Sequence, residues 1–401
     1  MADDFIFTSG SLTEGHPDKL CDKISDALVD HFLAEDPLAS VNAECAVATG
    51  ILFLALRFAG GVTPDVAAVA REAIRKAGYT QGGFQARSCS IMTSLAEGTP
   101  RTIQDERALD PADYDAFPAQ HQVTLFGFAC DQTPDYLPLP VALAHGMVRR
   151  LDALRGDGTL PGLMPDGQSQ VSVEYRERRP ARVATVALVS SVWPEGYGDL
   201  TALRRDLEEQ VVRPVLAEQA PELAGNTQVL INPHGHLRQG GPELHAGLTG
   251  RKTAIDTYGE YARHSGAALS GKDPGRIDRA GAYAARQAAR CVVAAGLARE
   301  CEVQLSYGIG QARPIGLDVE TFGTGRLPDE EIKRRLLDAF DFRPAAILAR
   351  LGLRHLPREQ GQPFYEALAT YGQMGRRDLA LPWEEDGLVE LSAGVNNPAR
   401  C

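Results

Sequence analysis

The segment Glu14-Gly-His-Pro-Asp-Lys19 places an imidazole, a carboxylate and an ammonium within one turn of chain. An amphipathic helix should begin here, because proline suits a first helical turn and apolar residues recur at helical spacing. These apolar residues are Leu20, Ile24, Leu28 and Phe32. Unpaired backbone N–H groups at a helix start attract anions, so the segment is a candidate grip for a phosphate-bearing substrate. The alternative is a capped helix whose His16 and Asp18 satisfy only backbone groups.

A second dense region, residues 240–278, combines many glycines with four cations. The cations are Arg251, Lys252, Lys272 and Arg276. Residues 266–272 have the GxxxxGK spacing of a phosphate-binding P-loop, but Asp273 stands where that loop needs Ser or Thr, and we therefore reject this motif. The alternative for the whole region is a solvated charged loop.

Taken together, the two regions hold the parts needed to bind a polyphosphate through magnesium. Asp18 and Asp278 supply the oxygen ligands that Mg²⁺ prefers, and the four cations would stabilise a departing oxyanion. Other catalytic signatures are missing from the sequence, which has no GxSxG and no HExxH motif.

Bulk properties narrow the class of protein. The 401 residues are enough for two or three domains, and 44% hydrophobic with 23% charged residues is typical of a globular protein. A net charge of −12 argues against nucleic acid or an anionic membrane as a partner. Seven cysteines without a CxxC pair indicate neither a zinc site nor a disulfide framework, and the sequence has no signal peptide or membrane-spanning run. We therefore expect a cytoplasmic protein.

Helices and strand pairs alternate along the chain, which predicts an α+β fold made of three related α/β units. The predicted strands are residues 43–49, 51–58, 171–175, 182–189, 227–231, 301–307 and 316–321. The predicted helices are residues 18–33, 64–77, 138–154, 199–216, 278–298 and 329–340. Boundaries are expected in the acidic stretch 101–118, a candidate mobile lid, and around residues 232–235.

At these motifs the chain resembles the S-adenosylmethionine synthetase family, also known as the methionine adenosyltransferases. The resemblance extends from about Phe5 to Trp383. The matching segments are Phe7-Thr-Ser9, Glu14–Lys19, Phe126-Gly-Phe-Ala129, Asp166 with Ser169-Gln170, Ile231-Asn-Pro233, Gly247–Lys252, Asp256-Thr-Tyr258, Ser270–Pro274, Asp278-Arg279 and Ala282–Arg286.

The resemblance implies a pseudo-threefold fold with domains at residues 5–103, 116–236 and 237–385. It also implies a reaction in which a thioether sulfur attacks C5′ of ATP and expels triphosphate, which is then cleaved to pyrophosphate and phosphate. Two Mg²⁺ per site and K⁺ are the implied cofactors. The implied assembly is a homodimer, or a dimer of dimers, whose active sites are shared between two subunits.

By the same resemblance, each candidate residue has an expected role. His16, Arg251 and Lys272 would be catalytic, Asp18 and Asp278 would hold magnesium, and Glu44 would bind potassium. The ATP and phosphate site would contain His16, Asp166, Gln168, Ser169, His236, Leu237, His245, Arg251, Lys252, Ala268 and Lys272. The acceptor site would contain Arg57, Gln104, His121, His245, Lys272 and Arg276.

Three acids of the family pattern are replaced at the acceptor end, by Arg57, His121 and His245. With neutral histidines, the local formal charge changes from −3 to +1. One misplaced like charge at ~4 Å costs about 4 kcal/mol near a protein surface, or roughly a thousandfold in binding. We therefore expect an acceptor thioether that keeps a carboxylate but lacks the α-ammonium of methionine. The alternative is a rearranged pocket in which other acids substitute.

The nucleotide end departs from the family pattern as well. Gln168 replaces a lysine, Leu237 a phenylalanine and His236 an arginine. Two further functions therefore stay open beside the adenosyltransferase: a hydrolase that cleaves triphosphate without sulfur attack, and a non-catalytic regulatory paralogue of an active synthetase.

Overall fold

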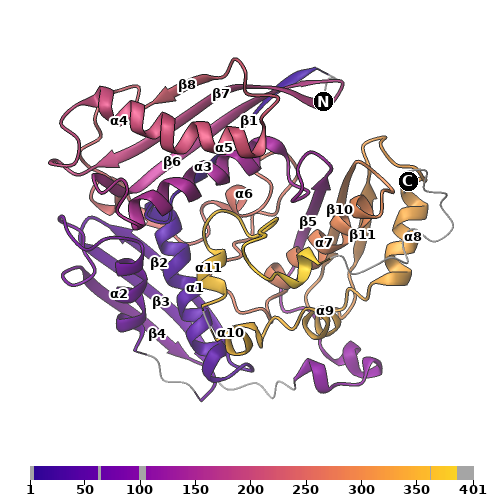
Figure 1. Cartoon of the computed structure of the whole chain (residues 1–401). Coiled ribbons are helices and arrows are strands. Elements are labelled where there is room, and N and C mark those ends of the chain that lie inside the picture. Colours follow the sequence, from indigo (N-terminus) through magenta and orange to yellow (C-terminus); the bar gives the residue numbers. More distant parts are fainter. Residues whose placement is uncertain (1–3, 62–64, 99–104, 362, 386–401) are drawn as a thin grey trace.

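A computed structural model describes residues 4–61, 65–98, 105–361 and 363–385, and its strands form three sheets around a common centre (Figure 1). The first sheet has the order β1-β6-β7-β8, the second β4-β3-β2-β9 and the third β11-β10-β5. Their bounds are β1 Phe5–Leu12, β2 Ser40–Ala48, β3 Ile51–Ala59, β4 Ser90–Glu97, β5 Val123–Cys130, β6 Leu163–Arg176, β7 Arg179–Val192, β8 Gln228–Ile231, β9 Gly247–Leu248, β10 Glu300–Tyr307 and β11 Gly316–Glu320.

One long helix packs against each sheet on the side that faces the centre. These helices are α1 (Pro17–Glu35) on β2, α3 (Leu139–Gly156) on β6 and α7 (Ile277–Ala294) on β5 and β10 (Figure 1). The remaining helices are α2 Val66–Lys76, α4 Leu200–Leu207, α5 Arg213–Gln219, α6 Thr253–Asp256, α8 Asp329–Ala339, α9 Pro344–Leu351, α10 Leu356–Gln360 and α11 Tyr365–Leu368. Three repeats of a sheet with an inner helix confirm the predicted α+β fold of three related units.

Each sheet contains one strand from a distant part of the chain. β1 at the N-terminus pairs with β6, β5 pairs with β10, and β9 pairs with β2. The three units are therefore interwoven, because each sheet combines strands from two of them. The predicted domain limits at residues 5–103, 116–236 and 237–385 stay a prediction.

All seven predicted strands and all six predicted helices are present in the structure, with shifts of a few residues at most ends, but β6 begins eight residues before the predicted strand 171–175. One predicted helix, residues 199–216, is divided into α4, a π-helical segment Glu208–Val212 and α5. Sequence patterns did not predict β1, β4, β5, β9 or the short helices α6, α9, α10 and α11. Across the described residues, none of the helices combines the length and apolarity needed to cross a membrane.

Part of the candidate lid, residues 101–118, lies outside the described residues. From residue 105 on, this stretch forms the 3₁₀ helices Glu106–Ala108 and Pro111–Ala116. Glu106 accepts a hydrogen bond from Arg354 at 3.0 Å, and Asp115 lies 3.1 Å from Arg343. The described part is thus tied to the C-terminal helical region by ion pairs.

Candidate functional site

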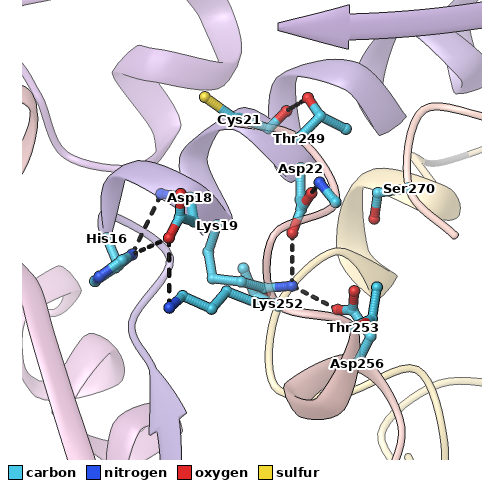
Figure 2. Close-up of polar contacts among 12 residues, drawn as sticks. His16, Asp18, Lys19, Cys21, Asp22, Thr249, Lys252, Thr253, Asp256 and Ser270 are labelled. Atoms are coloured by element: carbon cyan, nitrogen blue, oxygen red, sulfur yellow. Dashed lines mark hydrogen bonds and ion pairs between the residues drawn. The ribbon is translucent and has the colours of Figure 1, made fainter. Parts of the chain in front are cut away.

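The N-terminus of α1 positions His16 and Asp18 (Figure 2). His16 is the N-cap, Pro17 occupies the first helical turn, and Nδ1 of His16 accepts a hydrogen bond from the backbone N–H of Asp18 at 3.2 Å. Part of the simple capping interpretation is therefore correct. The capping histidine nevertheless also faces charged residues from other parts of the chain.

Lys19 differs from the sequence expectation, because it does not face a substrate. Its side chain is fully buried, and its ammonium donates to Asp22 at 2.9 Å and to Asp256 at 2.5 Å (Figure 2). Burial opposes the charged form, but the two carboxylates outweigh it and raise the pKa of Lys19. Lys19 thus joins α1 to α6, which follows directly after Arg251 and Lys252.

Replacing Lys19 with methionine should therefore destabilise the protein rather than act on chemistry alone. The change leaves Asp22 and Asp256 buried without their cation, and breaking a buried pair in this way costs roughly 3–5 kcal/mol. Denaturant unfolding followed by circular dichroism measures the effect. Lys252→Met is the matched control and should cost less than about 1 kcal/mol, because Lys252 is 35% exposed. Equal unfolding midpoints for Lys19→Met and the unmodified chain would contradict the assignment.

The first group, which we call the imidazole cluster, consists of His16, Asp18, Asp166, His245, Arg251 and Lys252. Asp18 is buried, and its carboxylate accepts from the backbone N–H of Leu248 at 3.1 Å. Arg251 and Lys252 lie 3.4 and 3.6 Å from the same carboxylate. The two cations thus point to one buried acid while remaining 52% and 35% exposed, which leaves them accessible to an anionic ligand.

His245 and Asp166 complete the imidazole cluster on the other side of His16. The rings of His16 and His245 have their centroids 5.0 Å apart, and Nε2 of His245 lies 3.3 Å from Oδ2 of Asp166. Burial lowers the pKa of His16 to about 4, so its imidazole is neutral at pH 7. The hydrogen bond to Asp166 raises the pKa of His245. Two neighbouring imidazoles therefore have opposite preferences for a proton.

Glycine is needed where the cationic loop approaches α1. A Cβ atom on Gly247 would lie 2.1 Å from the carbonyl oxygen of Pro17, which no side chain permits. Ala268 supports the same loop from behind, because a Cβ on Gly250 would lie 2.4 Å from its methyl group. This close packing fixes Arg251 and Lys252 over the start of α1.

The second group, which we call the acceptor cluster, consists of Arg57, His121, Lys272, Arg276 and Asp278. Lys272 lies 3.1 Å from Oδ1 of Asp278, and Nδ1 of His121 lies 3.0 Å from Oδ2. Arg276 donates to Nε2 of His121 at 2.6 Å. The contact between His121 and Asp278 lacks hydrogen-bond geometry, so within the described chain Oδ2 of Asp278 is a buried oxygen without a hydrogen bond.

A cavity of about 550 Å³ adjoins the acceptor cluster and is lined by Arg57, Arg276 and Glu97 among other residues. Arg354 also lines it but is neutralised internally, because it pairs with Glu106 at 3.0 Å and lies 3.8 Å from Asp273. Because Glu106 and Asp273 line the cavity as well, the lining holds three arginines and three acids, and the charged side chains outside the Arg354 group are Arg57, Arg276 and Glu97. Sequence reasoning missed Glu97, which pairs with Phe58 in the parallel register of β3 with β4 and lines the same cavity as Arg57.

The other predicted residues are distributed around the two clusters. Gln168 is exposed two residues after Asp166 on β6, whereas Ser169 turns inward and donates to the carbonyl of Ala144 at 2.8 Å. His236 and Leu237 are partly buried in the loop after β8, where Leu237 bridges to Ser191. Gln104 lies outside the described residues.

The two clusters lie near opposite ends of β2. Lys272 bridges to Asn42 near the start of this strand, and β9, which carries the imidazole cluster's loop, pairs with Ala46 and Val47 near its end. Four residues of strand span about 13 Å. Within one chain, the structure thus brings His16 and Asp18 together with Arg251 and Lys252, whereas Lys272 and Asp278 belong to a separate group.

Between these ends, the second sheet has an exposed apolar face. Glu44 is exposed on it, together with Ile51, Phe53, Met92 and Leu248, whose exposed fractions run from 43% to 58%. Monomeric proteins rarely expose a contiguous face of this kind, and such faces mark interaction surfaces.

Three family models match the chain. They are described as the N-terminal, central and C-terminal domains of S-adenosylmethionine synthetase and match residues 4–100, 116–237 and 239–385. The S-adenosylmethionine synthase of Synechococcus sp. (strain JA-3-3Ab) is 48% identical over 401 residues, which cover 96% of this chain and 97% of the relative. The S-adenosylmethionine synthase of Thermosynechococcus vestitus is 45% identical and covers 98% of both chains.

Proposed function

The chain belongs to the S-adenosylmethionine synthetase family, and from this premise we propose that it is an adenosyltransferase that joins the adenosyl group of ATP to a thioether. The observation that carries the proposal is the imidazole cluster. A neutral imidazole and two accessible cations surround a buried carboxylate at the start of α1. These groups can hold a polyphosphate whose bond from C5′ to oxygen breaks beside His16.

The reaction we propose is a displacement at carbon. The thioether sulfur attacks C5′, the bond from C5′ to oxygen breaks, and triphosphate leaves with the bonding electron pair, so that a sulfonium forms. Water then cleaves the triphosphate to pyrophosphate and phosphate. Arg251 and Lys252 stabilise the growing negative charge on the leaving oxygens, and His16, neutral at pH 7, donates a hydrogen bond to the departing oxygen.

The carboxylates of Asp18 and Asp278 fit magnesium by their chemistry. Mg²⁺ prefers oxygen ligands, and Oδ2 of Asp278 is a buried oxygen without a hydrogen bond, as a cation ligand requires. Magnesium supplies charge neutralisation on the phosphates when it is bound. Glu44 would contribute to a potassium site on the exposed face of the second sheet, where Asn42 donates to its carboxylate at 3.2 Å.

We infer that the complete site forms between two copies of the chain. A twofold axis through the exposed face of the second sheet places the start of β2 in one protomer near the end of β2 in its partner. The acceptor cluster of one protomer then meets the imidazole cluster of the other, twice per dimer. The apolar residues of this face would be buried in the same interface, and two such dimers would form the dimer of dimers.

The acceptor we propose is a small thioether carboxylate without an α-ammonium. Arg57 and Arg276 lie outside the group of Arg354, Glu106 and Asp273, so a carboxylate that reaches these two arginines is favoured and an ammonium beside them is opposed. Three acids line the cavity, and Glu106 and Asp273 both lie beside Arg354, whereas Glu97 does not. We expect Glu97 to moderate this preference without reversing it.

Product analysis tests the proposed function directly. The purified chain is incubated with ATP, Mg²⁺, K⁺ and a panel of thioethers that includes methionine and 3-methylthiopropionate. We expect mass spectrometry to detect a nucleoside sulfonium together with equal amounts of phosphate and pyrophosphate. Phosphate release without any sulfonium would identify the triphosphate-cleaving hydrolase instead. No turnover of ATP with any thioether would identify the regulatory paralogue.

A further inference from the structure

Another cavity lies between helices, apart from both clusters of the candidate site. It has a volume of about 590 Å³ and is lined by residues of α1, α2, α10 and α11. α1 packs against the other three helices (Figure 1). Among the described residues, none of those that line it belongs to the imidazole cluster, the acceptor cluster or the lining of the acceptor cavity. Cavities of this size suit small molecules.

Small apolar side chains leave room for a ligand in this cavity. Ala27 and Ala34 line it from α1, and Ala68, Val69 and Ala73 line it from α2. Ala34 and Ala68 are exposed, so the cavity opens to solvent along these two helices. Burying the apolar body of a ligand against such walls is favourable.

A buried polar atom of the lining lacks a partner. Glu366 in α11 is 6% exposed, and its Oε2 accepts a hydrogen bond from the ammonium of Lys76 at 2.9 Å. Within the described part of the chain, its Oε1 is buried without a hydrogen bond, which is costly for a carboxylate. The buried Asp30 differs, because its two oxygens accept the backbone N–H groups of Tyr365 and Glu366 at 2.9 and 2.8 Å. Glu366 therefore offers an acceptor to a ligand.

The charges around the cavity favour an uncharged ligand. Glu366 already pairs with Lys76, and Glu72 pairs with Arg75 at 2.6 Å. Burial raises the pKa of Asp30 to about 8, so this acid contributes little negative charge at pH 7. An arginine is thus left in excess, and an ammonium is opposed. The titratable side chains of the lining are Asp30, His31, Glu72, Lys76, Arg358 and Glu366.

We propose that this cavity binds a small, uncharged molecule that combines an apolar body with an N–H donor, such as a heteroaromatic ring. The apolar body packs against the alanines of α1 and α2, and the N–H group donates to Oε1 of Glu366. A hydrogen bond to an ionised acceptor is stronger than one between neutral groups, so the donor sets the orientation of the ligand. The site takes no part in adenosyl transfer and does not depend on that proposal.

Binding of indole tests this site, with benzofuran as the matched ligand, because benzofuran has the same ring shape with oxygen in place of the N–H group. Both are titrated by NMR against the full chain without ATP or a thioether, so failure of the adenosyltransferase proposal would leave the result unaffected. We expect indole to bind saturably with a Kd in roughly the millimolar range. Benzofuran should bind at least about tenfold more weakly, since it cannot donate to the carboxylate. No saturable binding of indole, or equal binding of the two ligands, would overturn the proposal.

Four variants locate the bound ligand. Ala68→Phe fills the cavity from an exposed position and should weaken indole binding at least about tenfold, whereas Ala217→Phe is the matched control at an exposed alanine of α5 outside the lining. Glu366→Gln should remove most of the preference for indole, because an amide can also donate to the oxygen of benzofuran. Lys76→Met breaks the same ion pair but keeps the carboxylate, so the preference should remain. Unchanged indole binding by Ala68→Phe, or an unchanged preference in Glu366→Gln, would overturn the proposal.

Discussion

Two inactive variants, His16→Ala and Lys272→Ala, should regain about a quarter of the unmodified activity when they are co-expressed in equal amounts. Each variant alone should lose roughly 10²–10³-fold in turnover, because each removes a group that stabilises the departing triphosphate. His16 belongs to the imidazole cluster and Lys272 to the acceptor cluster, which are separate groups in one chain. If a site combines one cluster from each protomer, one of the two sites in a mixed dimer is intact.

The expected fraction follows from random pairing in a twofold dimer. Half of the dimers contain one chain of each kind, and one of their two sites contains both an intact imidazole cluster and an intact acceptor cluster. About one site in four is therefore fully equipped. Steady-state release of phosphate and of the sulfonium product measures the recovery.

Co-expression of His16→Ala with Arg251→Ala is the matched control. Both residues belong to the imidazole cluster, so every site in every dimer lacks one of them, and no activity should return. Recovery in this control, or no recovery with Lys272→Ala, would contradict a site shared between protomers.

The sequence predicted the elements in which the spacing of apolar residues marks a buried face. β2 and β3 alternate buried and exposed residues, and α1 repeats its apolar positions at helical spacing. β5 was missed although it is apolar, because Gly127 interrupts the pattern. That glycine is required by α7, since a Cβ there would lie 2.0 Å from the backbone of Ala285. The requirement for this glycine comes from a helix far along the chain, so a local sequence pattern cannot indicate it.

β4 was missed for the opposite reason. Nearly all of its side chains are exposed, so no apolar alternation marks it as a strand. Its position at the sheet edge, in parallel register with β3, sets Glu97 opposite Phe58 at the end of the strand, where it lines the same cavity as Arg57. The consequence for function is large, because an acid in the acceptor cavity can be located only after this register is known.

The residues of the candidate site could be predicted from the sequence, but their geometry could not. The resemblance identified His16, Asp18, Arg251 and Lys252, which do lie together. The resemblance did not indicate that Lys19 forms a buried ion pair, because its partner Asp256 is 237 residues away. The division into two clusters was also not visible, since spacing along a chain does not say which groups meet within one copy.

The acceptor preference should change when the charge of the acceptor cavity is changed. The unmodified chain is expected to use 3-methylthiopropionate in preference to methionine, because Arg57 and Arg276 oppose an ammonium. Arg57→Glu changes the local charge by two units and should reverse the preference. A single misplaced charge at ~4 Å costs about 4 kcal/mol near a surface, so the ratio of kcat/KM for the two acceptors should shift by roughly a thousandfold or more.

Control variants separate this local effect from net charge. Arg57→Gln removes the cation without adding an acid and should give an intermediate ratio. Glu97→Gln should weaken the binding of methionine further, since it removes the cavity acid that is not beside Arg354. Arg87→Glu changes the net charge equally at an exposed position outside the cavity lining and should leave the ratio unaltered. A clear preference of the unmodified chain for methionine would mean that an acid such as Glu97 replaces the missing carboxylates, and the acceptor would then be methionine itself.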